Sequence, residues 1–338
     1  MAYSNYPGGF KAGITIRGVP IEMTHPGRVF WVGNSATRLE NEKTAADGND
    51  GSFLAPFSTL EGALNNSGVT AARGDVLFVR PGFTLTFGTA TALNFDKSGI
   101  AIIGLGSGSN RPTITMDTAT TATIPVTVNN FAIRNFIIVG NFDNIASAFT
   151  LTTADDFSVE DCEFRDTGAA LGFVNLIDTS AVANDSDGLY FARNRYVGLD
   201  TDAGDVPFNV DATQARWVIK DNYIYTNAIP TALGMIDSAA DAGLTTATIT
   251  GNIYRHAGTD VTYGLVQGTV GPSTSTGIIA DNMFLTRSTA ASAAISIAVA
   301  GSGIYRTRNV VLPTQAGAAA ANRGSEIDVI RQAVIIQA

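Results

Sequence analysis

A short segment recurs through the middle and the C-terminal half of the chain about every thirty residues. Its shared form is an apolar residue, two mostly polar residues, an asparagine or its substitute, and then a return to apolar residues. The copies begin at Ile133, Val159, Phe191, Ile219, Ile249, Ile279 and Arg306. From Phe136 the fourth position steps by 26, 32, 28, 30, 30 and 27 residues. A drifting period in this range indicates a solenoid in which each repeat forms one coil.

Each copy predicts a corner between two short strands, because β-branched and aromatic residues alternate with polar ones on both sides of it. Five copies have an asparagine at this corner, which are Asn194, Asn222, Asn252, Asn282 and Asn309. Asparagine tolerates the left-handed backbone conformation better than other non-glycine residues, so we expect it to make the turn itself. Stacked coils would place these residues roughly 4.8 Å apart, and their amides would form a ladder.

Variable coils with an asparagine corner resemble the right-handed parallel β-helix of pectate lyases and phage tailspikes. The resemblance covers roughly residues 75–312 and concerns the fold, not an activity. Leucine-rich repeats would need a leucine-dense consensus, and hexapeptide left-handed helices would need regular coils. A β-sandwich would show turn signals about every 8–12 residues without a recurring segment. The prediction is therefore an all-β protein built as a single right-handed parallel β-helix.

The chain divides into three predicted parts. Residues 1–52 form an extended N-terminal attachment arm and loop, residues 53–312 form the β-helix, and residues 313–338 form a linker and a terminal strand at Ile327–Ile336. The stretch from Pro56 to Gly82 resembles the opening of many β-helix proteins, in which an amphipathic helix covers the first coil. A capping box from Ser58 to Glu61 predicts this capping helix near 58–66. A cap is expected because an open coil end exposes apolar interior and a sheet edge.

The first thirty-five residues are rich in aromatic residues, glycine and proline. Such a segment rarely forms a core alone and suits docking on a partner. The residues that we expect to carry this attachment are Tyr3, Tyr6, Phe10, Ile14 and Ile16. Residues 29–32 are apolar enough that we expect the rod or the partner to order them.

The amino-acid composition argues against some classes of binding partner. The chain has 338 residues with 45% hydrophobic and 15% charged, against about 25% charged in a typical protein. A net charge of −9 argues against nucleic acid, whose phosphates need clustered lysine and arginine. The first residues do not look like a secretion signal, and no apolar run approaches membrane-spanning length. We therefore expect a protein assembled in the host cytoplasm rather than a secreted enzyme.

Carboxylates are the first candidates for chemistry, because a glycosidase needs two of them about 5–9.5 Å apart. The loops supply many, and nothing in the sequence selects one pair. The first that we would replace are Asp178, Asp205 and Asp237. The full loop set is Asp178, Asp185, Asp187, Asp200, Asp202, Asp205, Asp211, Asp237 and Asp241. We therefore predict no catalytic residue, and we expect no metal and no cofactor.

Other conspicuous residues favour structural roles. His256 is one of two histidines, and a lone loop histidine is usually structural. Cys162 stands at a corner position and is expected to be a small buried residue. Arg73-Gly74-Asp75 spells an integrin-type tripeptide but fits a helix-to-strand turn.

Two further groups of side chains are expected on the surface. The residue before each corner is an aspartate in some coils and an arginine in others, which predicts ion pairs between coils. These residues are Asp161, Arg193, Asp221, Asp281 and Arg308. Aromatic residues that could line a sugar groove, or pack against a neighbouring rod, include Trp217, Tyr223 and Tyr225.

These observations favour a non-enzymatic structural protein of a phage virion: a capsid decoration, cement or head-fibre protein. The resemblance to phage β-helices implies a homotrimer, and the arm implies binding to the major capsid protein or another virion protein. The alternative is a tailspike or tail fibre that binds, and in some cases cleaves, a host surface polysaccharide. A secreted pectin-type lyase is disfavoured by the missing signal and the scarce lysine.

Overall fold

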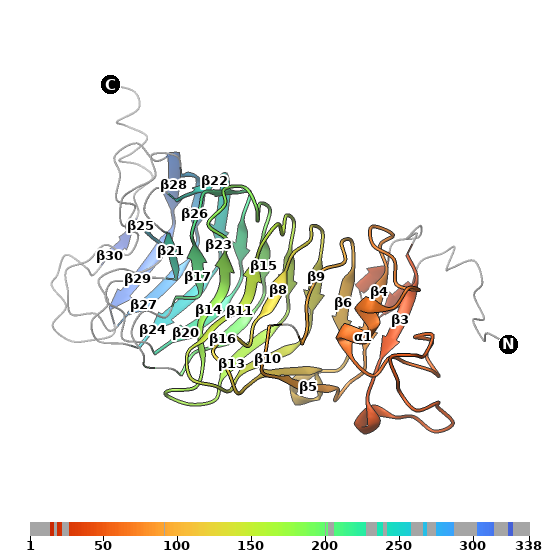
Figure 1. The fold of residues 1–338 in the computed structure, drawn as a ribbon. Helices are drawn as coiled ribbons and strands as arrows, with labels where there is room; N and C mark the ends of the chain where they lie inside the picture. Colours follow the sequence, from red (N-terminus) through yellow and green to blue (C-terminus); the bar gives the residue numbers. More distant parts are fainter. Residues whose placement is uncertain are drawn as a thin grey trace.

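The computed structural model describes residues 14–16, 19–21, 27–90, 92–199, 201, 206–227, 235–238, 242–257, 266–268, 275–286, 303–313 and 324–326. Three long sheets run side by side along a solenoid (Figure 1). Sheet 1 consists of β3 (Val29–Val32), β4 (Val76–Val79), β6 (Ala101–Gly104), β9 (Ala132–Arg134), β12 (Ser158–Glu160), β15 (Tyr190–Ala192), β19 (Val218–Lys220), β23 (Ala247–Thr250), β26 (Thr276–Ala280) and β28 (Gly303–Thr307).

Sheet 2 lies across the asparagine corner from sheet 1. It consists of β5 (Thr84–Phe87), β7 (Thr113–Met116), β10 (Ile137–Gly140), β13 (Glu163–Asp166), β16 (Arg195–Val197), β20 (Tyr223–Thr226), β24 (Ile253–His256), β27 (Met283–Thr286), β29 (Asn309–Pro313) and β30 (Gly324–Glu326). Sheet 3 consists of β8 (Ile124–Val126), β11 (Ile145–Leu151), β14 (Phe173–Thr179), β17 (Phe208–Val210), β21 (Ile236–Ser238) and β25 (Val266–Gly268).

The remaining elements are short. β18 (Gln214–Ala215) pairs with β22 (Leu244–Thr245), and β1 (Ile14–Ile16) pairs antiparallel with β2 (Val19–Ile21). The helical elements are α1 (Leu60–Asn65) and the 3-10 turns Ser35–Thr37 and Gly108–Asn110. None of these helical elements has the length and hydropathy to cross a membrane.

From β6 to β25 each coil visits sheet 1, sheet 2 and sheet 3 in turn. β12 ends at Glu160, a two-residue corner follows, and β13 and β14 continue the coil before β15 stacks on β12 with Val159 opposite Phe191. The pairing is parallel and in register, because every coil repeats the same alternation of apolar and polar residues. The predicted all-β parallel solenoid is confirmed. Its right-handed winding stays a prediction.

The core is a set of apolar columns along the solenoid axis. The inward column of sheet 1 contains Ile102, Ile133, Val159, Phe191, Ile219, Ile249 and Ile279, all buried. Phenylalanine rings fill the centre; those of Phe95 and Phe131 stack with centroids 4.2 Å apart, and those of Phe191 and Phe208 meet edge-on at 5.0 Å. One continuous core of this kind leaves each coil dependent on its neighbours for burial.

The helix at the N-terminal end forms where the sequence predicts it, but its cap differs by one residue. Thr59 is the N-cap, and its hydroxyl accepts from the Gly62 N–H at 2.8 Å. Ser58 instead donates to Asp47, and Glu61 accepts from the Asn94 N–H at 2.9 Å rather than reaching back to the cap. The helix buries Leu60, Ala63 and Leu64. That α1 closes the end of the core stays a prediction.

Sheet 1 begins earlier than residue 53, the predicted start of the β-helix. β3 pairs in register with β4, so the rod itself orders residues 29–32. At the other end β30 runs antiparallel to β29, inside the stretch predicted as a linker. The predicted strand Ile327–Ile336 lies outside the described residues, as do Tyr3, Tyr6 and Phe10 of the arm. Ile14 and Ile16 belong to β1.

Candidate functional site

The five corner asparagines form one buried column along the edge between sheets 1 and 2. In each, Oδ1 accepts from the backbone N–H of the corner residue in the preceding coil, at 2.8–3.1 Å. Each Nδ2 donates to a backbone carbonyl of sheet 1, and three of them also donate to the next Oδ1 at 2.8–3.0 Å. The column satisfies polar groups that the corner would otherwise leave buried without partners.

The expectation that asparagine itself adopts the left-handed conformation is wrong for these five residues. The positive φ belongs to the preceding residue in each coil, as in Arg193 at 56°, Asp221 at 56° and Asp281 at 58°. Asn135 has a φ of 61° because in its coil the asparagine is displaced by one position, and Phe136 takes the inward place. The asparagine is therefore selected for its amide inside the corner and not for its backbone.

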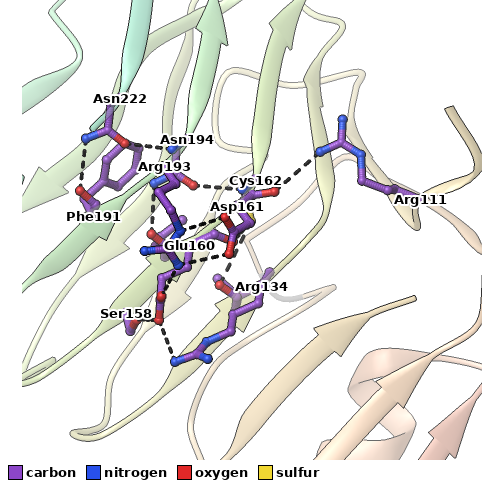
Figure 2. A network of polar contacts seen from close by, with 12 residues as sticks. Arg111, Arg134, Ser158, Glu160, Asp161, Cys162, Phe191, Arg193, Asn194 and Asn222 are labelled. Carbon is purple, nitrogen blue, oxygen red and sulfur yellow. Dashed lines mark hydrogen bonds and ion pairs between the residues drawn. The ribbon is translucent and has the colours of Figure 1, made fainter. Parts of the chain in front are cut away.

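The predicted ion pairs between coils are confirmed at two corners. Arg193 contacts Asp161 at 2.9 Å and Glu160 at 2.5 Å, and Glu160 also binds Arg134 (Figure 2). Arg308 contacts Asp281 at 2.5 Å. The asparagine amides are buried, whereas the Arg193 and Asp161 side chains beside them reach solvent. The Arg193–Asp161 and Arg308–Asp281 pairs are largely exposed, so each contributes little to stability.

Glu163 on the outer face of sheet 2 is shared by three arginines. Arg165 and Arg195 contact its Oε1 at 2.8 and 2.7 Å, and Arg111 binds its Oε2. Burial alone would raise the pKa of Glu163, but the hydrogen bonds and charges of Arg165 and Arg111 lower it to about 2. This carboxylate is therefore ionised across the physiological range and cannot serve as a proton donor.

Two of the aspartates named as first targets for replacement, Asp178 and Asp237, lie on sheet 3. Asp178 lies one coil from Asn209, which lies one coil from Asp237, so Asp178 and Asp237 are separated by two strand spacings, about 9.6 Å. Asn209 Nδ2 donates to both Asp178, at 2.8 Å, and Asp211, at 3.1 Å. Burial raises the pKa of Asp178, and the Asp211 charge adds to that rise. Asp205 lies outside the described residues.

The other loop aspartates within the described residues support the backbone. Asp187 Oδ1 accepts from the Ala215 N–H at 2.7 Å, and the Asp185 carbonyl accepts from the Ala154 N–H at 2.6 Å. Asp200, Asp202 and Asp241 lie outside the described residues. Within the part of the chain that the structure describes, no three acidic, histidine or cysteine side chains are grouped to hold a metal ion.

Cys162 and His256 are both buried. Cys162 takes an asparagine's place at the N-terminal end of the column, and burial raises the pKa of its thiol to about 12. His256 Nδ1 lies 2.8 Å from the Thr226 hydroxyl, and burial lowers the pKa of this histidine to about 4. Both groups are neutral at physiological pH, so neither is poised as a nucleophile or a cation.

Two sequence features that a binding partner could have contacted, had they been exposed, are buried. Trp217, considered as an outward aromatic, is wholly buried, and its indole N–H donates to the Ser186 carbonyl at 2.8 Å. Asp75 of the integrin-type tripeptide is also wholly buried, and its carboxylate accepts from the backbone of Arg28 and Thr70. Tyr223 and Tyr225 do face outward, at alternate positions of β20.

The N-terminal end of the rod carries an apolar turn that the sequence did not single out. The Trp31 N–H of β3 donates to the Gly51 carbonyl, and the Phe57 N–H donates to the Trp31 carbonyl, so residues 51–57 lie along the outer edge of the terminal strand of sheet 1. Within this segment Phe53 and Leu54 occupy the two central positions of a tight turn and are 47% and 46% exposed. Turn centres usually hold glycine, proline or short polar residues.

Contacts with Trp31 and Arg80 hold the apolar turn in place. The Phe53 ring meets the Trp31 ring edge-on at 4.8 Å, and the Arg80 guanidinium lies 5.2 Å from the Phe53 centroid. Arg80 also donates to the Phe53 carbonyl and forms a buried ion pair with Glu42. A pair of exposed apolar side chains on a fixed backbone is preorganised to enter a pocket on another molecule.

Searches among family models, curated proteins and solved structures found no match to the chain.

Proposed function

We propose that this protein is a non-enzymatic structural protein of a phage virion, a capsid decoration, cement or head-fibre protein that is held by its N-terminal end. The observation that carries the proposal is the apolar turn of Phe53 and Leu54. It lies along the outer edge of β3, the terminal strand of sheet 1, and directly follows the predicted arm and loop of residues 1–52.

Exposing two large apolar side chains at a turn forfeits their burial, which is worth about 1.5–3 kcal/mol for each side chain when it is complete. The turn is ordered by Trp31 and Arg80, so binding loses little conformational entropy. A stiff body with such a turn at one end suits attachment through that end. The major capsid protein or another virion protein would supply the pocket, and a homotrimer would present three such turns.

The test is co-sedimentation of the purified protein with virions from which it has been stripped. The double variant Phe53→Ser, Leu54→Ser should bind at least about thirty-fold more weakly, because the loss of even one central apolar anchor costs about 2 kcal/mol or more. The matched control is Val182→Ser, which removes an equally exposed apolar side chain, 55% exposed, from a loop in the middle of the rod. It should bind like the unchanged protein.

Two results would overturn the proposal. If the unchanged protein does not bind stripped virions and remains a monomer in solution, the assignment to a virion is wrong. If the protein binds and the double variant binds equally well, the N-terminal turn is not the attachment surface. Circular dichroism of both variants would show that each retains its β-structure.

A further inference from the structure

Two adjacent coils near the middle of the rod carry the same succession of side chains on the outside. One coil consists of β12, β13 and β14, and the next consists of β15, β16 and β17. In each coil an arginine points outward from sheet 2, an exposed leucine follows in the connection to sheet 3, and an aspartate lies on or just after the sheet 3 strand. These residues are Arg165, Leu171 and Asp178 in the first coil and Arg195, Leu199 and Asp211 in the second.

The outer face of sheet 2 in these coils has an excess of positive charge. Arg165 and Arg195 contact Glu163 Oε1 at 2.8 and 2.7 Å, and Arg111 binds the other oxygen of the same carboxylate. One carboxylate neutralises one of the three guanidinium groups, so two positive charges remain. The side chains of Arg165 and Arg195 are 43% and 54% exposed, which makes this charge accessible to another molecule.

The outer face of sheet 3 has the opposite charge. Its six described strands contain no lysine or arginine. Asn209 Nδ2 donates to both Asp178 and Asp211, which holds the two carboxylates close together. Neither carboxylate belongs to an ion pair among the described residues. Two like charges held this close are stabilised by a cation that another molecule supplies.

The exposed leucines lie at the corner between the basic face and the acidic face. Leu171 and Leu199 are 36% and 39% exposed. Their connections are hydrogen-bonded to the coils, because the Leu199 N–H donates to Asp166 Oδ2 at 2.8 Å and the Thr201 N–H donates to the Ala169 carbonyl at 3.1 Å. Apolar side chains on a backbone fixed in this way lose little conformational entropy when another molecule covers them.

We infer that copies of this chain associate side by side, with the basic face of sheet 2 of one copy against the acidic face of sheet 3 of the next. Such a contact joins two different surfaces, so it closes into a ring only if successive copies are related by rotation without translation. Arg165 and Asp178 belong to one coil, and Arg195 and Asp211 belong to the next. Rotation about an axis parallel to the rods therefore brings opposite charges to the same height. The smallest ring of this kind has three copies.

The ring also accounts for the exposed leucines. Each copy presents sheet 2 to one neighbour and sheet 3 to the other, so the corner between these two sheets faces the axis of the ring. Leu171 and Leu199 of all copies meet there and leave contact with water. The charges decide which faces meet, and the leucines add apolar burial. The ring forms without a virion, so the inference is independent of attachment through the apolar turn of Phe53 and Leu54.

Sedimentation equilibrium of the purified full chain over a range of concentrations measures the association. Asp211→Arg should raise the concentration of half-association at least about ten-fold, because a like-charge contact replaces an attractive one at every interface. Asp221→Arg is the matched control and should leave the association unchanged. It makes the same charge change at the corner between sheets 1 and 2, where other coils hold Arg193 and Arg308 in the same backbone conformation. Both variants make the net charge of −9 less negative, so a general effect of charge would strengthen association in both.

The double variant Arg195→Asp, Asp211→Arg exchanges the charges across the contact and should recover most of the affinity that Asp211→Arg loses. A protein that stays monomeric at every concentration would overturn the inference, and if that monomer still bound stripped virions, the proposed function would stand. Equal weakening by Asp211→Arg and Asp221→Arg, or no recovery in the double variant, would also overturn it. Loss of virion binding by Arg195→Asp in a monomeric protein would assign the basic face to a virion partner instead.

Discussion

Replacing Asn252 by alanine tests whether the buried asparagine column stabilises the rod. Asn252 lies inside the column, and its side chain makes four hydrogen bonds. Its Oδ1 accepts from the N–H of Asn222 at 3.1 Å and from the Nδ2 of Asn222 at 2.8 Å. Its Nδ2 donates to the Ile219 carbonyl and to the Asn282 Oδ1, each at 2.9 Å.

The magnitude follows from what the substitution leaves behind. The Asn222 Nδ2 keeps the Phe191 carbonyl as its acceptor, and the Asn282 Oδ1 keeps the N–H of residue 252. The Asn222 backbone N–H loses its acceptor inside the protein. An unsatisfied buried donor costs about 1–3 kcal/mol, and the other lost bonds are worth about 1 kcal/mol each. We expect Asn252→Ala to lower the free energy of unfolding by about 4–6 kcal/mol.

The assay is urea denaturation followed by circular dichroism, together with amide hydrogen exchange. Exchange is needed because a solenoid can open locally, and the loss should appear first in β19, β20, β23 and β24. Asn175→Ala is the control, since Asn175 makes one bond, to the Ala146 carbonyl, on the outer face of sheet 3. The reasoning fails if both variants shift the urea midpoint equally and the Asn222 amide is no less protected in Asn252→Ala.

Three other predictions concern buried polar groups. Cys162→Asn should hold or raise the melting temperature while Cys162→Ala lowers it, because an asparagine at this position continues the column toward Phe136. In the unchanged protein the Cys162 thiol, whose pKa burial raises to about 12, should react with iodoacetamide only after unfolding. Glu42→Ala should cost about 3–5 kcal/mol in urea denaturation by leaving Arg80 buried without its partner, whereas Asp281→Ala, at an exposed pair, should leave the midpoint nearly unchanged. His256 has a folded pKa of about 4 against 6.5 for the free side chain, so the unfolded chain binds the proton more readily. Stability should therefore fall by up to about 3 kcal/mol between pH 6.5 and pH 4, and a His256→Gln variant, compared over the same range, should lack that component.

The sequence predicted some features of the asparagine corner and its surroundings but not others. The repeat identified the five corner asparagines and the alternation of acidic and basic residues before them. It did not reveal which corner residue bends the backbone, because a left-handed conformation at Arg193 is unfavourable for an isolated residue and is stabilised only by the stacked coils. Nor did it reveal the Glu163 cluster, since Arg111 and Glu163 are 52 residues apart and meet through coils of unequal length.

The sequence by itself determined the solenoid, because a recurring apolar alternation can bury its inward face only by stacking one coil on the next. It also determined the positions of the asparagine column, because the spacing of the copies sets which residues share a corner. Only the tertiary structure decided which side chains reach solvent. Trp217 lies inside and Phe53 outside, although the tryptophan is the larger apolar group. Exposure depends on which neighbouring coil covers a side chain, and that neighbour lies about thirty residues away along the chain.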